Sequence, residues 1–174
     1  AYLGGGSTAD LARYIVPGLT NRLLSRVVRR AFVTHDETVA AFPDGVARVT
    51  GSPVRRAFLT RMASPVPTGD AMQVLVLGGS QGAKALNTAV PAALARLRDR
   101  GVRVSVTHQT GAASRDAVAA AYAAEGLDAS VVAFIDDVAA VMAAASLVVC
   151  RAGAMTVAEL GVLGRPALYV PLPT

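Results

Sequence analysis

The sequence has one cysteine, no tryptophan and few aromatic residues of any kind. Aromatic side chains make up 5% of the chain. Cys150 has no second cysteine to pair with, which excludes an intrachain disulfide framework and favours a reducing, cytoplasmic setting. Proteins that hold single-stranded nucleic acid stack its bases on aromatic side chains. Their scarcity therefore argues against a nucleic-acid partner.

Long hydrophobic runs are also missing. The longest apolar run extends only from Val138 to Cys150, shorter than the roughly 20 residues that span a bilayer. Hydrophobic residues nevertheless make up 53% of the chain and charged residues 17%. This composition is typical of a globular protein with a sizeable core.

Acidic residues are scarce in the first third of the chain. Residues 1–61 carry nine arginines and four acidic residues, within a net charge of +5. A basic region of this kind indicates an anionic partner, such as phosphates or lipid headgroups. Arginines alternate with an apolar face of Leu23, Leu24, Val27 and Val28, which predicts a basic amphipathic helix from residue 19 to 30. It either docks by that face with its arginines in solvent or contacts an anionic membrane surface.

Glycine and proline divide the chain into unequal parts. Residues 1–13 contain Gly4-Gly5-Gly6-Ser7 without periodicity, so we expect a linker-like or disrupted N-terminal end. Residues 14–52 hold the basic helix and short strand-like runs, while residues 53–70 are rich in breakers and predict an interdomain linker. Residues 71–174 form the regular part.

In that regular part, strand-like runs alternate with helical stretches. The expected strands are 74–77, 102–107, 131–134, 147–150 and 167–170, and the expected helices are 83–100, 114–125, 137–144 and 156–163. Alternation requires right-handed crossovers between parallel strands. It predicts an α/β fold, a Rossmann-like doubly wound parallel sheet with the strand order 3-2-1-4-5.

The first of these strands ends in a glycine-rich turn. The apolar run 74–77 breaks at Gly78-Gly79-Ser80-Gln81-Gly82 before a helical pattern begins at Ala83. Free amides and the positive end of the helix dipole would face a ligand above Gly79 and Ser80, so a diphosphate is the predicted ligand. The alternative is a tight turn without a ligand, because one glycine pattern is a weak signal.

A second loop is predicted to face the first. In this strand order, the loops after the first and fourth strands meet across a crevice at the carboxyl edge of the sheet. The later loop, 151–156, leads into a helix that carries Glu159. Its carboxylate can accept hydrogen bonds from both hydroxyls of a ribose. Alternatively, Glu159 only complements the helix dipole.

Other chemistries find little support. The glycine turn is not Gly-x-Gly-x-x-Gly, and the strand 102–107 brings no acidic residue for a ribose, so a nicotinamide enzyme is disfavoured. His35 and His108 belong to no hydrolytic triad or ligand-spaced group, and no metal or cofactor is predicted. Cys150 ends an apolar strand and is interpreted as a core residue.

Six segments in order resemble the MurG-type glycosyltransferase family, UDP-N-acetylglucosamine:N-acetylmuramyl-(pentapeptide) pyrophosphoryl-undecaprenol N-acetylglucosaminyltransferase. They are Val16-Pro17-Gly18-Leu19-Thr20-Asn21-Arg22, Gly51-Ser52-Pro53-Val54-Arg55, Gly78-Gly79-Ser80-Gln81-Gly82-Ala83, His108-Gln109-Thr110-Gly111, Phe134-Ile135-Asp136-Asp137, and residues 150–159. The resemblance implies a GT-B enzyme that transfers GlcNAc from UDP-GlcNAc to the lipid-linked muramoyl-pentapeptide acceptor, converting lipid I to lipid II in peptidoglycan synthesis. It also implies a cytoplasmic enzyme, peripheral on the plasma membrane, that needs no cofactor.

The resemblance assigns roles by position. Arg55 would lie by the nucleotide at the interdomain hinge, the backbone of Ile135 would recognise uracil, and Glu159 would accept the ribose hydroxyls. The other UDP-GlcNAc-binding positions, which hold the diphosphate or complete the nucleotide wall, are Gly79, Ser80, Gln81, Gly82, Gly153, Ala154, Met155 and Thr156.

The chain also departs from the family pattern. Residues 14–52 would be the tail of the acceptor domain, and 71–174 a UDP-sugar-binding domain incomplete at its C-terminus. The catalytic residues are expected in the rest of the N-terminal domain, and Leu11-Ala12-Arg13-Tyr14 stands where the family has His-Glu-x-Asn. Two alternatives to an intact catalyst stay open: a non-catalytic nucleotide-binding or regulatory module, and a donor-binding half completed by a partner chain.

Overall fold

The chain divides into two compact units. The structure, a computed structural model, describes residues 9–12, 19–62, 64–79 and 83–171. The units are Ala1–Val54 and Arg55–Thr174. Each is described by itself below.

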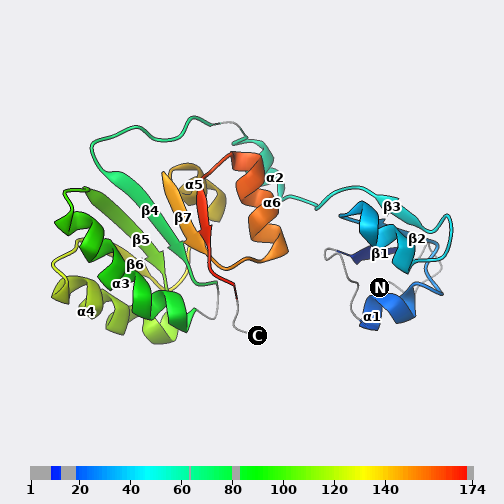
Figure 1. Cartoon of the computed structure of the whole chain (residues 1–174), viewed down its shortest axis with the longest axis horizontal. Helices are drawn as coiled ribbons and strands as arrows, with labels where there is room; N and C mark the ends of the chain where they lie inside the picture. The colour runs from blue at the N-terminus through cyan, green and yellow to red at the C-terminus, as the bar shows by residue number, and fades with distance from the viewer. Residues whose placement is uncertain (1–8, 13–18, 63, 80–82, 172–174) are drawn as a thin grey trace. The chain divides into compact units, whose positions relative to one another are not determined.

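The first unit holds a small parallel sheet with the order β1-β2-β3 (Figure 1). Its elements are β1 (Ala9–Ala12), α1 (Leu19–Leu24), β2 (Arg30–Val33), the 3-10 helix η1 (Asp36–Ala41) and β3 (Ala47–Val49). Strand β1 falls within residues 1–13, so the linker expected there is wrong for these four residues. The segment has no strand pattern of its own, and its pairing with β2 from Ala9 opposite Arg30 determines the strand.

Helix α1 is shorter than the predicted basic helix, and its apolar face is split. Val28 is buried with the core of the first unit, and Leu24 packs against that core. Leu19, Leu23 and Val27 are instead exposed, at 73%, 62% and 63%. The predicted apolar face therefore only partly covers the core.

The second unit confirms the predicted fold class. Its sheet is parallel throughout, with the order β6-β5-β4-β7-β8, which is 3-2-1-4-5 when the strands are counted within this unit. The strands are β4 (Met72–Leu77), β5 (Val104–Gln109), β6 (Ala129–Val132), β7 (Leu147–Cys150) and β8 (Ala167–Tyr169). The helices are α2 (Arg56–Leu59), α3 (Lys84–Asp99), the 3-10 turn η2 (Ala112–Ser114), α4 (Arg115–Ala124), α5 (Val138–Ala143) and α6 (Ala154–Leu163).

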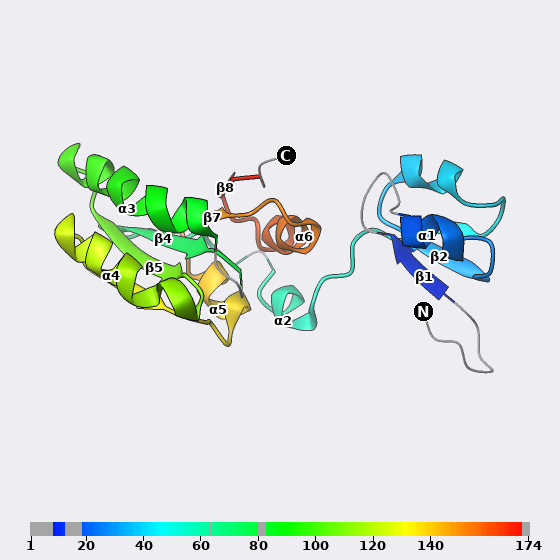
Figure 2. The same ribbon diagram turned by 90° about the horizontal axis from the view of Figure 1, so that it is seen from below.

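Helices cover both faces of this sheet. Helix α3 packs against α4, and α6 packs against α5 and α2. Figure 2 shows α3 and α4 on one side of the strands and α5 and α6 on the other. Val74 and Val76 of β4 pack into the cluster under α3 and α4, and the intervening Leu75 is also buried. A strand buried on both faces explains the continuous apolar run. None of the helices among the described residues is long and apolar enough to cross a membrane.

Two strand boundaries differ from the prediction in ways that matter for the site. Strand β5 starts at Val104 and continues through His108 and Gln109, two residues beyond the predicted end. Strand β6 lies two residues earlier than predicted, so Phe134 and Ile135 fall in the loop after it. Both shifts follow from strand pairing, which sets His108 opposite Val76 and Val131.

Candidate functional site

A cavity of about 260 Å³ opens at the carboxyl edge of the sheet in the second unit. Strands β4 and β7 are neighbours there, while their following strands β5 and β8 lie on opposite sides of the pair. Ligands of open α/β sheets bind at such a switch point. The lining residues are Arg55, Leu77, Gly78, Gly79, Gln109, Phe134, Val138, Met142, Cys150, Arg151, Thr156 and Glu159.

One wall is the turn after β4. The amide of Gly78 donates to the carbonyl of Gln109 at 3.0 Å, which ties this turn to the end of β5. Gly79 has a φ of 77°, and a Cβ built there would meet nothing within 4 Å. Glycine is required by the backbone conformation, and the space beside Gly79 is open. Ser80, Gln81 and Gly82, the other predicted diphosphate ligands, lie outside the described residues.

The opposite wall is the loop after β7 and the start of α6. Gly153 is the N-cap residue of α6, and Thr156 and Glu159 on the first turns of this helix line the cavity. Arg151 also lines it, and its Nη1 donates to the carbonyls of Val170 and Pro171 at 3.3 and 2.8 Å. Arg151 thereby fixes the segment that follows β8.

Glu159 is the buried carboxylate of this wall. Its residue exposure is 3%. Arg55 forms a two-bond ion pair with it: Nε donates to Oε1 at 2.7 Å and Nη2 donates to Oε2 at 3.1 Å. The hydrogen bonding that Arg55 donates to Glu159 raises the pKa of Arg55, burial opposes this, and the negative charge of Glu159 adds to the increase. The site therefore holds an arginine paired with a buried carboxylate.

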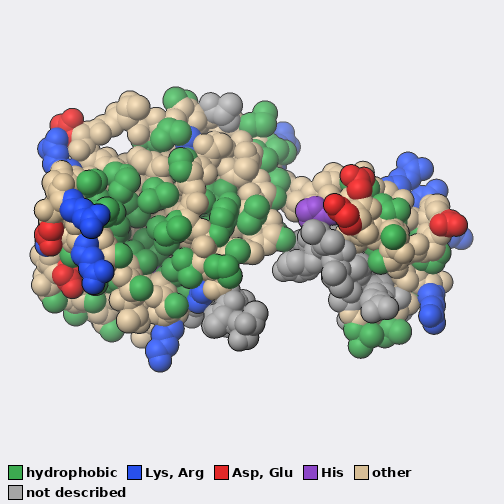
Figure 3. Space-filling view, in the orientation of Figure 1, with side chains coloured by type: hydrophobic (Ala, Val, Ile, Leu, Met, Phe, Trp, Pro, Cys, Tyr) green, Lys and Arg blue, Asp and Glu red, His purple; other side chains and the backbone are tan. Residues whose placement is uncertain are grey.

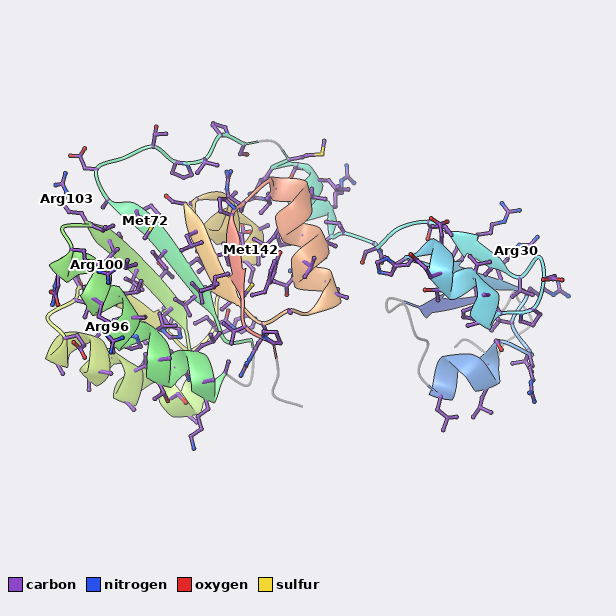
Figure 4. The ribbon with its side chains drawn as sticks, in the orientation of Figure 1. Arg30, Met72, Arg96, Arg100, Arg103 and Met142 are labelled. Carbon is purple, nitrogen blue, oxygen red and sulfur yellow. The ribbon has the colours of Figure 1, made fainter. Side chains whose placement is uncertain are left out.

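A third part of the wall comes from the loop between β6 and α5. Phe134 lines the cavity and is 61% exposed, while Ile135 beside it is buried. Asp137 caps α5, since its Oδ1 accepts from the amide of Ala140 at 2.9 Å. Met142 of the same helix, labelled in Figure 4, completes this apolar side of the cavity. The cap fixes the backbone immediately after Ile135.

Cys150 lines the cavity but is poorly suited to act as a nucleophile. Its residue exposure is 1%, and burial raises the pKa of its thiol to about 11. The thiol is therefore protonated at neutral pH. This agrees with its interpretation as a core residue.

Buried polar contacts hold the end of β5 in place. His108 is fully buried, and its Nδ1 lies 3.0 Å from the hydroxyl of Tyr122 on α4. Burial lowers the pKa of His108 to about 4, so the ring is neutral at pH 7. Asn87 of α3 donates to the carbonyl of Thr110 at 3.2 Å. These contacts hold the chain on either side of the cavity-lining Gln109.

The predicted site residues divide into three groups. Arg55, Gly79, Thr156 and Glu159 line the cavity together. Gly153, Ala154 and Met155 form the start of α6, and Ile135 lies beside the lining residue Phe134. The third group consists of Ser80, Gln81 and Gly82, which lie outside the residues that the structure describes.

Several lining residues were not assigned from the sequence, notably Gln109, Phe134 and Arg151. Each belongs to a segment that resembles the family, and each follows or ends a strand. The rule that ligands bind at the carboxyl ends of parallel strands would have found them.

Comparison with known proteins gives a consistent family. Residues 73–174 match the glycosyltransferase family 28 C-terminal domain. Two curated relatives are named UDP-N-acetylglucosamine–N-acetylmuramyl-(pentapeptide) pyrophosphoryl-undecaprenol N-acetylglucosamine transferase. The one from Solibacter usitatus is 46% identical over 157 residues, covering 90% of this chain and 43% of the relative. The one from Sorangium cellulosum is 51% identical over 171 residues, covering 97% and 42%.

A solved structure agrees. The crystal structure of Acinetobacter baumannii MurG matches with a TM-score of 0.72 and 35% identity, covering 97% of this chain and 47% of that one. The chain thus spans less than half the length of the relatives it matches. Because the family match covers more than half of the chain, the chain belongs to glycosyltransferase family 28, with residues 73–174 matching the C-terminal domain of that family.

Proposed function

We propose that the second unit binds UDP-GlcNAc as a glycosyl donor. The observation that carries the proposal is the buried carboxylate of Glu159, paired with Arg55, in a cavity that is also lined by Gly78 and Gly79. A carboxylate suits the two hydroxyls of a ribose, and a glycine turn before a helix suits a diphosphate. The relatives from Solibacter usitatus and Sorangium cellulosum carry UDP-N-acetylglucosamine in their names.

The cavity supports one placement of the nucleotide. Glu159 accepts the ribose hydroxyls, the backbone of Ile135 recognises uracil, and Gly79 with Ser80, Gln81 and Gly82 holds the diphosphate. Arg55 lies beside the nucleotide, and Gly153, Ala154, Met155 and Thr156 complete the wall. The exposed ring of Phe134 next to Ile135 fits a site for a flat base.

The reaction of the whole protein follows from this donor site. We propose transfer of GlcNAc to the lipid-linked muramoyl-pentapeptide acceptor, which converts lipid I to lipid II by direct displacement at the anomeric carbon of the sugar. Helix α3 starts at Lys84 and α6 at Ala154, next to the two loops of the crevice. Their N-termini favour negative charge and would stabilise the departing UDP.

The domain roles are part of the same proposal. Residues 14–52 correspond to the tail of an acceptor domain, residues 53–70 to an interdomain linker, and residues 71–174 to the UDP-sugar-binding domain. The chain spans less than half of its relatives, and we assign the groups that activate the acceptor to the remaining part of the N-terminal domain. We assign donor binding and stabilisation of the departing UDP to the cavity of the second unit.

We further propose that the first unit contacts the cytoplasmic face of the membrane. In Figure 3, arginine side chains lie at several separate places on the surface of this unit, which contains no lysine. Leu19, Leu23 and Val27 are exposed beside the exposed Arg26. Basic and apolar groups together favour adsorption to anionic headgroups.

Hydrogen exchange with and without saturating UDP-GlcNAc tests the donor site. We expect slower amide exchange in peptides that contain Gly78 and Gly79, residues 134–138, and the first turns of α6. Peptides from α4, which does not line the cavity, serve as the internal control, and their amide exchange rates should not change. Protection elsewhere, or no protection at a concentration that saturates binding, would contradict the proposed site.

A further inference from the structure

We propose that Arg55 is a positioning residue for the nucleotide: its guanidinium orients the carboxylate of Glu159 so that both carboxylate oxygens can accept ribose hydroxyls. The inference rests on the proposed function, in which Glu159 accepts those hydroxyls. It adds a second residue, from a distant part of the chain, to the recognition of the ribose.

The geometry of the ion pair leaves acceptor capacity free. A carboxylate offers about four lone-pair positions on its two oxygens. Arg55 uses one on Oε1, through Nε at 2.7 Å, and one on Oε2, through Nη2 at 3.1 Å. One lone pair remains on each oxygen. Two neighbouring hydroxyls of a ribose require that number of acceptors.

The two bonds also fix the orientation of the carboxylate. The last torsion of a glutamate side chain has broad, weak preferences, so a single hydrogen bond would leave the carboxylate plane free to rotate. A guanidinium that donates two parallel bonds sets that plane. The carboxylate is then already ordered before the nucleotide binds, so binding loses less conformational entropy.

The burial of the two partners shows which one depends on the other. The side chain of Glu159 is 4% exposed, while that of Arg55 is 54% exposed. A buried carboxylate needs a charged partner, whereas a half-exposed guanidinium is also solvated by water. Within the described part of the chain, the hydrogen bonds to this carboxylate come from Arg55. Arg55 therefore supports Glu159.

Arg55 is itself held in place. Its Cζ lies 4.9 Å from the centre of the Phe58 ring, and Phe58 is 1% exposed. A guanidinium above an aromatic ring is attracted by the negative face of the ring. Arg55 is also the N-cap residue of α2, which packs against α6, the helix that carries Glu159. Arg55 and Glu159 therefore belong to two helical segments that pack against each other.

A different role for Arg55 would be direct contact with the diphosphate. The two roles give different binding patterns with UDP and 2′,3′-dideoxy-UDP, which lacks both ribose hydroxyls. Calorimetric titration of both ligands measures how strongly each variant recognises the hydroxyls. The quantity of interest is the ratio of the two dissociation constants.

The parent should bind UDP roughly 10- to 100-fold more tightly than the dideoxy compound, as expected for charge-assisted hydrogen bonds. In Arg55→Met the ratio should fall below about threefold, because the carboxylate is no longer oriented. Arg55→Lys keeps the charge without the two-bond geometry, so its ratio should stay well below that of the parent. Arg61→Met is the matched control: Arg61 pairs with Asp137 at 2.9 Å, and neither residue lines the cavity. Its ratio should equal that of the parent.

Each other outcome overturns the inference in a recognisable way. If Arg55→Met weakens both ligands equally and keeps the parental ratio, Arg55 contacts the phosphates. If Arg55→Lys keeps the full parental ratio, charge alone suffices and the orienting geometry is irrelevant. Equal binding of both ligands by the parent would instead remove the role of Glu159 in the proposed function. A parental ratio that persists in Arg55→Met removes only the role of Arg55.

Discussion

Arg55 and Glu159 are 104 residues apart in the sequence, and their side chains form a two-bond ion pair in the wall of the crevice. Arg55 is the first residue of the second unit, and Glu159 lies on α6. The site therefore uses a residue from the segment that precedes the sheet as well as the loops at its carboxyl edge. The first prediction concerns the carboxylate of this pair.

Glu159→Gln should weaken UDP binding far more than it weakens folding. Loss of the charge removes charge-assisted bonds to the ribose hydroxyls, at a cost of about 1.5 to 3 kcal/mol in binding free energy. Glutamine keeps the volume of the buried side chain, whereas Glu159→Ala would also leave a cavity beside Arg55. Calorimetry and thermal melts of the same preparations separate the two effects.

The control for this substitution is Glu37→Gln, since Glu37 is an exposed acid of the first unit. It should bind UDP like the parent. Parental UDP affinity in Glu159→Gln, with a lowered melting temperature, would mean that Glu159 is purely structural.

Arg165 should be important for stability. It is 6% exposed, and its guanidinium donates four hydrogen bonds to the carbonyls of Ala143, Ser64 and Pro65. Ala143 is the last residue of α5, where a positive charge is favourable. Arg165→Ala leaves these acceptors unpaired and should lower the free energy of unfolding by about 2 to 4 kcal/mol. Urea denaturation measures the loss.

A surface arginine provides the comparison. Arg103, labelled in Figure 4, pairs with Asp70 at 2.9 Å, with both side chains largely exposed. Arg103→Ala should change the free energy of unfolding by less than about 1 kcal/mol. Similar losses in Arg103→Ala and Arg165→Ala would show that the contacts of Arg165 add no stability of their own.

His108 should make the protein less stable in mild acid. Its pKa is about 4 in the folded chain against an ordinary value of 6.5. Between these values the unfolded chain binds a proton that the folded chain does not. The stability of the folded chain therefore increases with pH between 4 and 6.5 and decreases when the solution is acidified through this window. The contribution over this window amounts to up to about 3 kcal/mol.

Urea unfolding at several pH values between 7 and 4 tests this. His108→Asn should start less stable, because it loses the contact with Tyr122, but show a flatter dependence on pH. His35→Asn, which changes the other histidine of the chain, should keep the parental slope. Parallel curves for the parent and His108→Asn would exclude His108 as the source.

Binding to vesicles tests the proposed membrane contact. Co-sedimentation should show binding to anionic but not neutral vesicles, and the binding should weaken as salt is added. Arg26→Gln removes one exposed charge and should lower the affinity about fivefold, corresponding to roughly 1 kcal/mol. Salt-insensitive binding to neutral vesicles would instead indicate adhesion by Leu19, Leu23 and Val27.

Local sequence patterns were sufficient for the architecture of the second unit. The apolar run that ends at Leu77 and the glycines that follow the helices of this unit mark where strands and helices alternate. This alternation strongly limits the possible topologies. The strand 147–150 has the predicted bounds because it is a short apolar run between clear breaks. The strand order then placed two loops at one crevice.

What depended on tertiary contacts was not predictable. The pairing of Arg55 with Glu159 joins distant segments, and no local pattern encodes it. His108 belongs to β5 because its backbone pairs with Val76 and Val131 of the neighbouring strands. Strand β1 exists through its pairing with β2. In each case the deciding neighbour comes from elsewhere in the chain.

The most direct test of the central claim, a uridine diphosphate site in the crevice, is calorimetric titration of the folded chain with UDP, ADP and GDP. The account predicts one-to-one binding of UDP, with ADP and GDP at least about tenfold weaker because they lack the bonds that a uracil makes. Equal affinity for the three nucleotides, or no binding of UDP by protein that gives a cooperative thermal melt, would contradict it.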